Sequence, residues 1–466
     1  MKRSASEHLD NWLAENNRKP LVIRGARQVG KTWLVRDLAA RHNLTLIELN
    51  LERNPSLAAL FNTNDPGETL LNLESEFNTP IDPKTTLLFL DEIQAAPELF
   101  AKLRWFKEDI KDLALVAAGS LLEFSLNTYQ YSMPVGRITY LYLEPFSFFE
   151  FLEATGNQFL LKKLARFSMN DTIPLSLHEK ALKLYHTYCL VGGMPEVLQK
   201  WAGTGDLTSC MKLQQDLLAT FRDDFYKYGD RFDPDLLFKL FISVCRQIGA
   251  KFIYSQVDPS ATSPAVKKGL TLLCQARVFS MIRHTSANGL PLGAESNDKF
   301  FKTLMADTGL VSAHLDLSSI PYPQAGDLIF TNKGPLAEQF VGQQLRAAQS
   351  PLTDPALFYW QRTGGRQGEI DYIVQHQNRI VPVEIKSGKA GSMKSLHQFM
   401  HDKHLDMAVR INANLPEVTQ IRVKTTKGDP VAYTLVSIPL YLAQQIDALI
   451  SGLIKALEEI TADDPA

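Results

Sequence analysis

The chain has 466 residues, of which 45% are hydrophobic and 21% charged, and its formal net charge is −2. Such a length exceeds one hydrophobic core and predicts about three globular domains. The near-neutral charge argues against a protein that coats nucleic acid through bulk charge. Its apolar runs are all shorter than a membrane span, and no apolar core follows the basic residues at the start. We therefore expect a cytoplasmic protein without a membrane partner.

The cysteines do not predict a metal centre or a disulfide framework. There are four, Cys189, Cys210, Cys245 and Cys274, and none forms a Cys-x-x-Cys pair. Isolated thiols of this kind are typical of a reducing compartment.

Residues 21–32 form the most informative motif of the chain. An apolar run, LVIR, leads directly into G-x-x-x-x-G-K-T, and a helix-like segment follows at residues 33–40. This strand–loop–helix context is typical of a P-loop, whose backbone amides bind the phosphates of ATP. Lys31 is expected to neutralise the β- and γ-phosphates, and Thr32 to ligate Mg²⁺. The expected nucleotide contacts are Gly25, Ala26, Arg27, Gln28, Val29, Gly30, Lys31, Thr32 and Trp33.

A second strand predicts the catalytic acids. Residues 85–94 read TTLLFLDEIQ, an apolar run that ends in two adjacent carboxylates. The carboxyl ends of parallel strands share one edge of a sheet, so this pair is expected beside the P-loop. Asp91 is expected to hold Mg²⁺ through water, and Glu92 to polarise the attacking water. The second acid favours hydrolysis over transfer to a small-molecule acceptor.

Two further residues are candidates for phosphate contacts. A strand at residues 113–118 ends in Gly119-Ser120, which would place Ser120 near the γ-phosphate. Ordinary turn chemistry explains the same pair. Arg137 precedes another apolar run and is either an arginine finger or sensor or a plain surface arginine.

The remaining patterns divide the chain into four segments. Residues 1–155 alternate strands and helices as a doubly wound parallel α/β domain does, and residues 156–232 are helical with a Gly-Gly-Met-Pro break at 192–195. Residues 233–314 follow the order of a winged helix-turn-helix: helices at 234–249, 254–257 and 263–275, then an apolar run and a Gly-rich segment. Lys267 and Lys268 then lie on the recognition helix and would contact DNA. The alternative is a winged helix that serves only as a packing lid.

The last segment, residues 315–466, begins with a linker at 315–332 and carries three acids and a lysine. Glu338 lies in an amphipathic helix, Asp371 in a strand, and Glu384 and Lys386 in a second strand after a turn at 376–379. The hairpin would bring Asp371 close to Glu384 and Lys386. Carboxylates around one Mg²⁺, with Asp371 and Glu384 as ligands and a lysine beside the water, suit phosphodiester cleavage. A salt-bridged pair of strands is the structural alternative.

This arrangement resembles the PD-(D/E)xK, or restriction-endonuclease-like, fold. The whole chain is similar to prokaryotic ATPases that join an AAA+-type domain to such a carboxy-terminal α/β domain of unassigned function. The similarity covers GARQVGKT (25–32), FLDEIQ (89–94), AAGS (117–120), VGRITYLYLEPFSFFEFL (135–152), GGMPEV (192–197), ADTGL (306–310), LAEQFVGQQL (336–345), GEIDYIV (368–374) and PVEIKSG (382–388).

The resemblance implies ATP, Mg²⁺ and DNA as partners. Related AAA+-type proteins often form rings, so a homo-oligomer is a further expectation. Two functions stay open at this point. One is an Mg²⁺-dependent ATPase coupled to DNA binding, with or without DNA cleavage at Glu338, Asp371, Glu384 and Lys386. The other is a nucleotide-switched interaction protein whose carboxy-terminal domain is a non-cleaving platform for DNA or protein.

Overall fold

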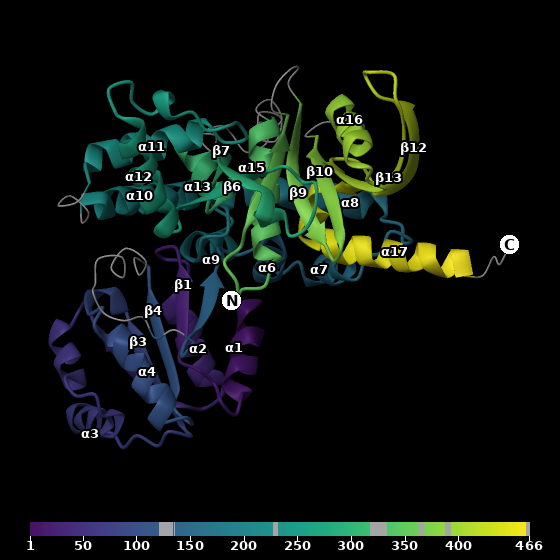
Figure 1. Ribbon diagram of the computed structural model, residues 1–466. Coiled ribbons are helices and arrows are strands. Elements are labelled where there is room, and N and C mark those ends of the chain that lie inside the picture. The colour runs from purple at the N-terminus through teal and green to yellow at the C-terminus, as the bar shows by residue number, and fades with distance from the viewer. Residues whose placement is uncertain are drawn as a thin grey trace. The chain divides into compact units, whose positions relative to one another are not determined.

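The computed structural model describes residues 1–120, 134, 136–226, 232–316, 333–362, 368–386 and 393–462. The chain divides into two compact units. The first unit comprises residues 1–145, 270–278 and 349–355, and the second comprises residues 146–269, 279–348 and 356–466. Each unit contains one β-sheet (Figure 1).

The first unit is built on a five-stranded parallel sheet, as the alternating pattern predicts. Its strands follow the order β2-β3-β4-β1-β5. All six residues of both β3 and β4 are buried, which explains why these segments are apolar throughout. The strands are β1 (Leu21–Gly25), β2 (Thr45–Asn50), β3 (Thr86–Asp91), β4 (Ala114–Gly119) and β5 (Thr139–Leu143).

Helices cover both faces of this sheet (Figure 1). Alternate residues of β3 divide between the faces: Leu87 and Phe89 join the core under α1 (Ala5–Ala14) and α2 (Lys31–Arg41). Leu88 and Leu90 join the core under η1 (Pro55–Phe61), α3 (Pro66–Phe77) and α4 (Leu99–Asp109). The architecture is therefore a parallel α/β layer structure of the P-loop type.

The second unit begins with helices. The expected break is confirmed, since α8 ends at Val191 and α9 begins at Pro195. The helices are α6 (Phe148–Ala154), α7 (Gln158–Ala165), α8 (Leu175–Val191), α9 (Pro195–Thr204), α10 (Leu207–Tyr226), α11 (Pro234–Arg246), α12 (Ser263–Gln275), α13 (Thr308–His314), α15 (Lys333–Ala347), α16 (Lys394–Lys403) and α17 (Ile446–Ala462). The described part of this unit also contains the 3-10 helices η3 (Tyr254–Gln256), η4 (Leu292–Glu295) and η6 (Leu440–Gln445).

Two motifs of the resemblance, GGMPEV and ADTGL, meet at a buried carboxylate. Asp307 Oδ2 accepts a hydrogen bond from the Gly193 amide at 2.6 Å, and Asp307 Oδ1 accepts one from the Leu310 amide at 3.1 Å. A Cβ on Gly192 would lie 2.1 Å from Asp307 Oδ1, so only glycine fits there. The break after α8 is therefore bonded to the start of α13.

The second unit also holds an eight-stranded mixed sheet of order β12-β13-β11-β10-β9-β8-β6-β7. The predicted hairpin is confirmed, because β9 and β10 pair antiparallel with His376 opposite Arg379. The strands are β6 (Phe279–Thr285), β7 (Ser296–Met305), β8 (Leu357–Gln361), β9 (Glu369–His376), β10 (Arg379–Ile385), β11 (Met407–Asn412), β12 (Glu417–Lys424) and β13 (Pro430–Pro439).

The strands of the expected winged helix belong to this same sheet. The elements α11, η3, α12, β6 and β7 occur in the expected order. However, β6 pairs in parallel with β8, with Ile282 opposite Leu357, so the sheet crosses the expected boundary between residues 314 and 315. The hairpin is therefore not an independent wing. From residue 317 on, the expected linker lies outside the described residues.

In the part of the chain that the structure describes, no helix combines the length and the apolar composition that crossing a bilayer requires.

Candidate functional site

The P-loop joins β1 to α2 with a backbone that depends on glycine. A Cβ on Gly25 would lie 2.6 Å from the carbonyl oxygen of Leu143 and 2.9 Å from Val29 Cγ1. Gly30 has φ 98° and forms the N-cap of α2. Gly25 is therefore required because β5 and Val29 leave no space for a side chain, and Gly30 is required because its backbone is left-handed. Among the expected contacts Ala26 and Val29 are buried, Arg27 is half-buried, and Gln28 and Trp33 are exposed.

Lys31 points back into the loop. Its Nζ donates hydrogen bonds to the carbonyl oxygens of Gly25 at 3.1 Å and Ala26 at 2.9 Å. Burial lowers the pKa of Lys31 to about 8, although the charges of Glu92 and Asp91 oppose this shift. A buried ammonium at the amino terminus of a helix provides a strongly positive site for phosphate groups.

The start of α2 is joined to the end of β3. The Thr32 hydroxyl donates a hydrogen bond to Asp91 Oδ2 at 3.1 Å, and Asn50 Nδ2 lies 3.4 Å from the same oxygen. Burial and the charge of Glu92 together raise the pKa of Asp91 to about 6, although the Thr32 hydrogen bond acts in the opposite direction. A hydroxyl and a carboxylate side by side are oxygen ligands of the type that Mg²⁺ prefers, so these residues fit the ion.

Glu92 follows immediately in an unusual backbone conformation. Its φ of 52° and ψ of 45° lie in the left-handed region, which costs free energy for a non-glycine residue. Gln94 Nε2 donates a hydrogen bond to Glu92 Oε2 at 2.5 Å, which fixes the carboxylate. Strained residues of this kind concentrate at functional sites.

Ser120 lies at the same edge of the sheet. It follows β4, whose Gly119 pairs with Arg24 of β1 and whose Ala118 pairs with Asp91 of β3. Because β4 lies between β1 and β3, the buried Ser120 comes between the P-loop and the acids.

Arg137 lies at the opposite edge. It precedes β5, whose first residue Thr139 pairs with Leu21 at the start of β1, far from the loop at the end of that strand. The Arg137 Nε instead lies 2.9 Å from Glu108 Oε1. This position and the ion pair favour the plain surface arginine of the two alternatives, and the arginine finger or sensor stays a prediction.

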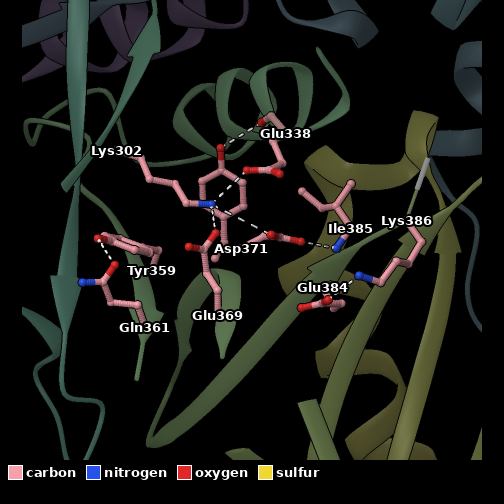
Figure 2. A network of polar contacts seen from close by, with 10 residues as sticks. Lys302, Glu338, Tyr359, Gln361, Glu369, Asp371, Glu384, Ile385 and Lys386 are labelled. Carbon is pink, nitrogen blue, oxygen red and sulfur yellow. Dashed lines mark hydrogen bonds and ion pairs between the residues drawn. The ribbon is translucent and has the colours of Figure 1, made fainter. Parts of the chain in front are cut away.

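In the second unit, the structure brings together the acids and the lysine that the sequence singled out (Figure 2). Asp371 Oδ2 accepts a hydrogen bond from the Ile385 amide at 2.7 Å, and Lys386 Nζ donates one to Glu384 Oε1 at 2.5 Å. Glu338 reaches them from α15 (Figure 2).

A β-bulge positions Asp371. In the pairing of β8 with β9, Phe358 lies opposite Ile373 and Trp360 opposite Ile370, so one residue of β8 faces two residues of β9. These two residues are Asp371 and Tyr372. Bulges re-aim side chains in this way next to functional sites. As a result, the Tyr372 hydroxyl donates a hydrogen bond to the Glu338 carbonyl oxygen on α15 at 2.8 Å.

Sequence reasoning missed two members of this site, Lys302 on β7 and Glu369 on β9. Lys302 is completely buried, and its Nζ lies 3.0 Å from Glu338 Oε2 and 3.9 Å from Asp371 Oδ1. It also contacts the Glu369 carboxylate. The sequence signal for Lys302 is weak: it is a lysine between apolar residues in the second half of β7, where residues 300–305 read FFKTLM. We call the whole group the carboxylate–lysine cluster: Lys302, Glu338, Glu369, Asp371, Glu384 and Lys386.

Two acids of the cluster, Glu338 and Glu384, resist ionisation. Burial raises the pKa of Glu338 to about 8 and that of Glu384 to about 7, and the charge of Asp371 contributes to both shifts. Burial by itself lowers the pKa of Lys302, but the charges of Glu338, Glu369 and Asp371 outweigh it and raise that pKa. The lysines of the cluster are therefore cations at neutral pH.

Comparison with protein families gives three matches. Residues 17–152 match an AAA domain. Residues 182–320 match one domain of unknown function (DUF8612), and residues 333–429 match another (DUF4143). Comparison with curated proteins gives no match. The parallel sheet, the loop geometry and the AAA match together support an AAA-type P-loop ATPase in the first unit.

Proposed function

We propose that the protein is an Mg²⁺-dependent ATPase in which Lys31 neutralises the β- and γ-phosphates and Glu92 polarises the attacking water. The observation that carries the proposal is the hydrogen bond between Thr32 and Asp91 beside the buried Lys31. Thr32 and Asp91 would hold the Mg²⁺, which neutralises charge on the phosphate oxygens when it is bound. Ser120, at the same edge of the sheet, would contact the γ-phosphate.

Nucleotide binding is the first test of this proposal. We expect calorimetric titration of the full chain with ATP and Mg²⁺ to show binding, and the Lys31→Ala variant to show none. Lys84→Ala, which removes an exposed lysine from a loop before β3, is the matched control. If the wild-type chain, shown to be folded by circular dichroism, gives no heat with ATP or GTP, the proposal is wrong.

We further propose that the nucleotide state controls contact of the second unit with DNA. Lys267 and Lys268, both exposed on α12, support this part of the proposal. Phosphate contacts make binding salt-dependent, so Lys267→Gln/Lys268→Gln should reduce the slope of log K against log salt by about 2. The double substitution Lys180→Gln/Lys183→Gln, at exposed positions of α8, is the control. Fluorescence anisotropy with linear, branched and single-stranded DNA, with and without ATP, measures the salt dependence of binding and the effect of the nucleotide.

A second candidate function, the nucleotide-switched interaction protein, is favoured by Lys302. Its ammonium lies beside Glu338 and Asp371, and the Lys386 ammonium lies beside Glu384, so cations already face the carboxylates that a cleaving site would use for a metal ion. We therefore expect the second unit to act as a platform rather than as a nuclease. Incubation of these DNAs with Mg²⁺ or Mn²⁺ tests this expectation. Cleavage by the wild type that is lost in Asp371→Ala and Lys386→Ala would establish the nuclease instead.

A further inference from the structure

Lys302 occupies the point at which three carboxylates converge. Glu338 comes from α15, and Glu369 and Asp371 come from β9 (Figure 2). The side chain of Lys302 has no exposed surface, whereas that of Glu369 is 38% exposed. A buried charge is stable only when it is paired, and these acids supply the pairing. Because the lysine reaches them from a third element, β7, its placement depends on the tertiary fold.

The same oxygen atoms are those that a divalent cation would need. Mg²⁺ and Mn²⁺ prefer carboxylate oxygens, but Glu338 Oε2 and Asp371 already lie beside the Lys302 ammonium, and Glu384 Oε1 lies beside Lys386 Nζ. Within the described ranges, no group of three or more His, Cys, Asp and Glu side chains is arranged to hold a metal ion. The residues present therefore do not fit the ion that the nuclease-like pattern implies.

One buried carboxylate oxygen of the cluster stands outside these pairs. Glu384 Oε2 is buried and has no hydrogen-bond partner among the residues that the structure describes. A cation bound there would lie close to Lys386, which is hydrogen-bonded to the other oxygen of the same carboxylate. Like charges at such distances repel strongly when water is excluded. This oxygen alone does not make a metal site.

We propose that Lys302 is a built-in cation, whose ammonium takes the place of a divalent metal ion in the carboxylate–lysine cluster. The cluster is then complete without metal, and its acids hold β7, β9 and α15 together instead of ligating an ion. This inference does not depend on ATP hydrolysis in the first unit, and it is tested without nucleotide.

The first experiment compares metal binding by two forms of the full chain. Nucleotide-free wild type and Asp371→Asn are titrated with Mn²⁺ and followed by electron paramagnetic resonance. We expect identical isotherms, because any ion bound near Asp91 contributes equally to both. An Mn²⁺ site in the wild type that Asp371→Asn weakens about tenfold or more would overturn the proposal.

The second experiment creates the site that the ammonium prevents. Lys302→Met keeps an unbranched side chain that is one atom shorter and removes its charge, and Lys299→Met, at an exposed position of β7, is the matched control. We expect Lys302→Met to gain an Mn²⁺ site that is absent in the control and is lost again in Lys302→Met/Asp371→Asn. A folded Lys302→Met chain without that site contradicts the proposal. If Lys302→Met does not fold, the comparison of wild type with Asp371→Asn decides the question.

Discussion

The Thr32 hydroxyl donates a hydrogen bond to Asp91 Oδ2 at 3.1 Å, although 59 residues separate the two in the chain. Thr32 lies in α2, which follows β1, and Asp91 ends β3; these two strands are not neighbours, because β4 lies between them. The contact therefore depends on the whole sheet, which places the first turn of α2 over the end of β3. It joins the phosphate-binding loop to the acid that would hold Mg²⁺.

Glu92→Gln should separate ATP binding from ATP hydrolysis. Glutamine preserves the shape of the side chain and an acceptor for Gln94, but it cannot accept a proton from water. We expect ATP affinity close to that of the wild type. The turnover rate should fall by about 10²-fold or more, as it does when a general base is lost. Phosphate release and calorimetry measure the two quantities. Glu76→Gln, at an exposed position of α3, is the control. Normal hydrolysis by Glu92→Gln would show that another group activates the water.

The pH dependence of hydrolysis should reflect Asp91. Because its pKa is raised to about 6, the carboxylate becomes protonated at mildly acidic pH and then cannot ligate Mg²⁺. We expect the Mg²⁺-dependent rate to fall as the pH decreases through about 6. The pH profile of kcat/KM, which reports the free enzyme, measures it. A rate that is constant from pH 7.5 to pH 5 would contradict the role given to Asp91.

Asp91→Asn should stabilise the nucleotide-free protein at alkaline pH. The folded state raises the pKa of Asp91 from 3.8 to about 6, so it binds the proton more tightly than the unfolded state does. The ionised carboxylate therefore destabilises the fold above pH 6, and this effect is lost as the pH falls toward 4. We expect the melting temperature of Asp91→Asn to exceed that of the wild type at pH 8 and to approach it at pH 4.5. Scanning calorimetry without nucleotide measures the difference in melting temperature. Equal melting temperatures at pH 8 would contradict the raised pKa of Asp91.

Gly25→Ala should disturb the P-loop by steric overlap. The added methyl group would lie 2.6 Å from the Leu143 carbonyl oxygen, a backbone atom that cannot move without shifting β5. We expect a loss of about 1–3 kcal/mol of stability, together with weaker ATP binding. Gly203→Ala in α9 is the control, because a Cβ there meets nothing within 4 Å and alanine favours a helix. Chemical denaturation of both variants measures the difference, and equal stabilities would contradict the close approach.

The sequence predicts the first site far better than the second. Lys31, Thr32, Asp91 and Glu92 occur in contiguous motifs, so local patterns and the rule for parallel strands place them together. The direction of β5 places Arg137 at the other edge, and a run of apolar residues does not reveal that direction. The position of Lys302 depends on the pairing of β7 with β6 and of β6 with β8, and the bulge at Asp371 depends on the pairing of β8 with β9. No spacing within one motif encodes a register between distant strands.

Asp307→Ala should destabilise the second unit more than the loss of an ordinary helix cap. Asp307 is fully buried and accepts hydrogen bonds from the amides of Gly193 and Leu310, and from Gln343 Nε2 at 3.3 Å. Alanine would leave the Gly193 and Leu310 amides buried without an acceptor, which costs about 1–3 kcal/mol for each unsatisfied group, whereas Gln343 Nε2 keeps its hydrogen bond to the Tyr188 hydroxyl. Asp233 is the matched comparison, because it caps α11 at an exposed position, where Asp233→Ala should cost about 1 kcal/mol. Urea denaturation of both variants measures the costs. If Asp307→Ala costs no more than Asp233→Ala, the junction between α8 and α13 is not held by this carboxylate, and the GGMPEV and ADTGL motifs need another explanation.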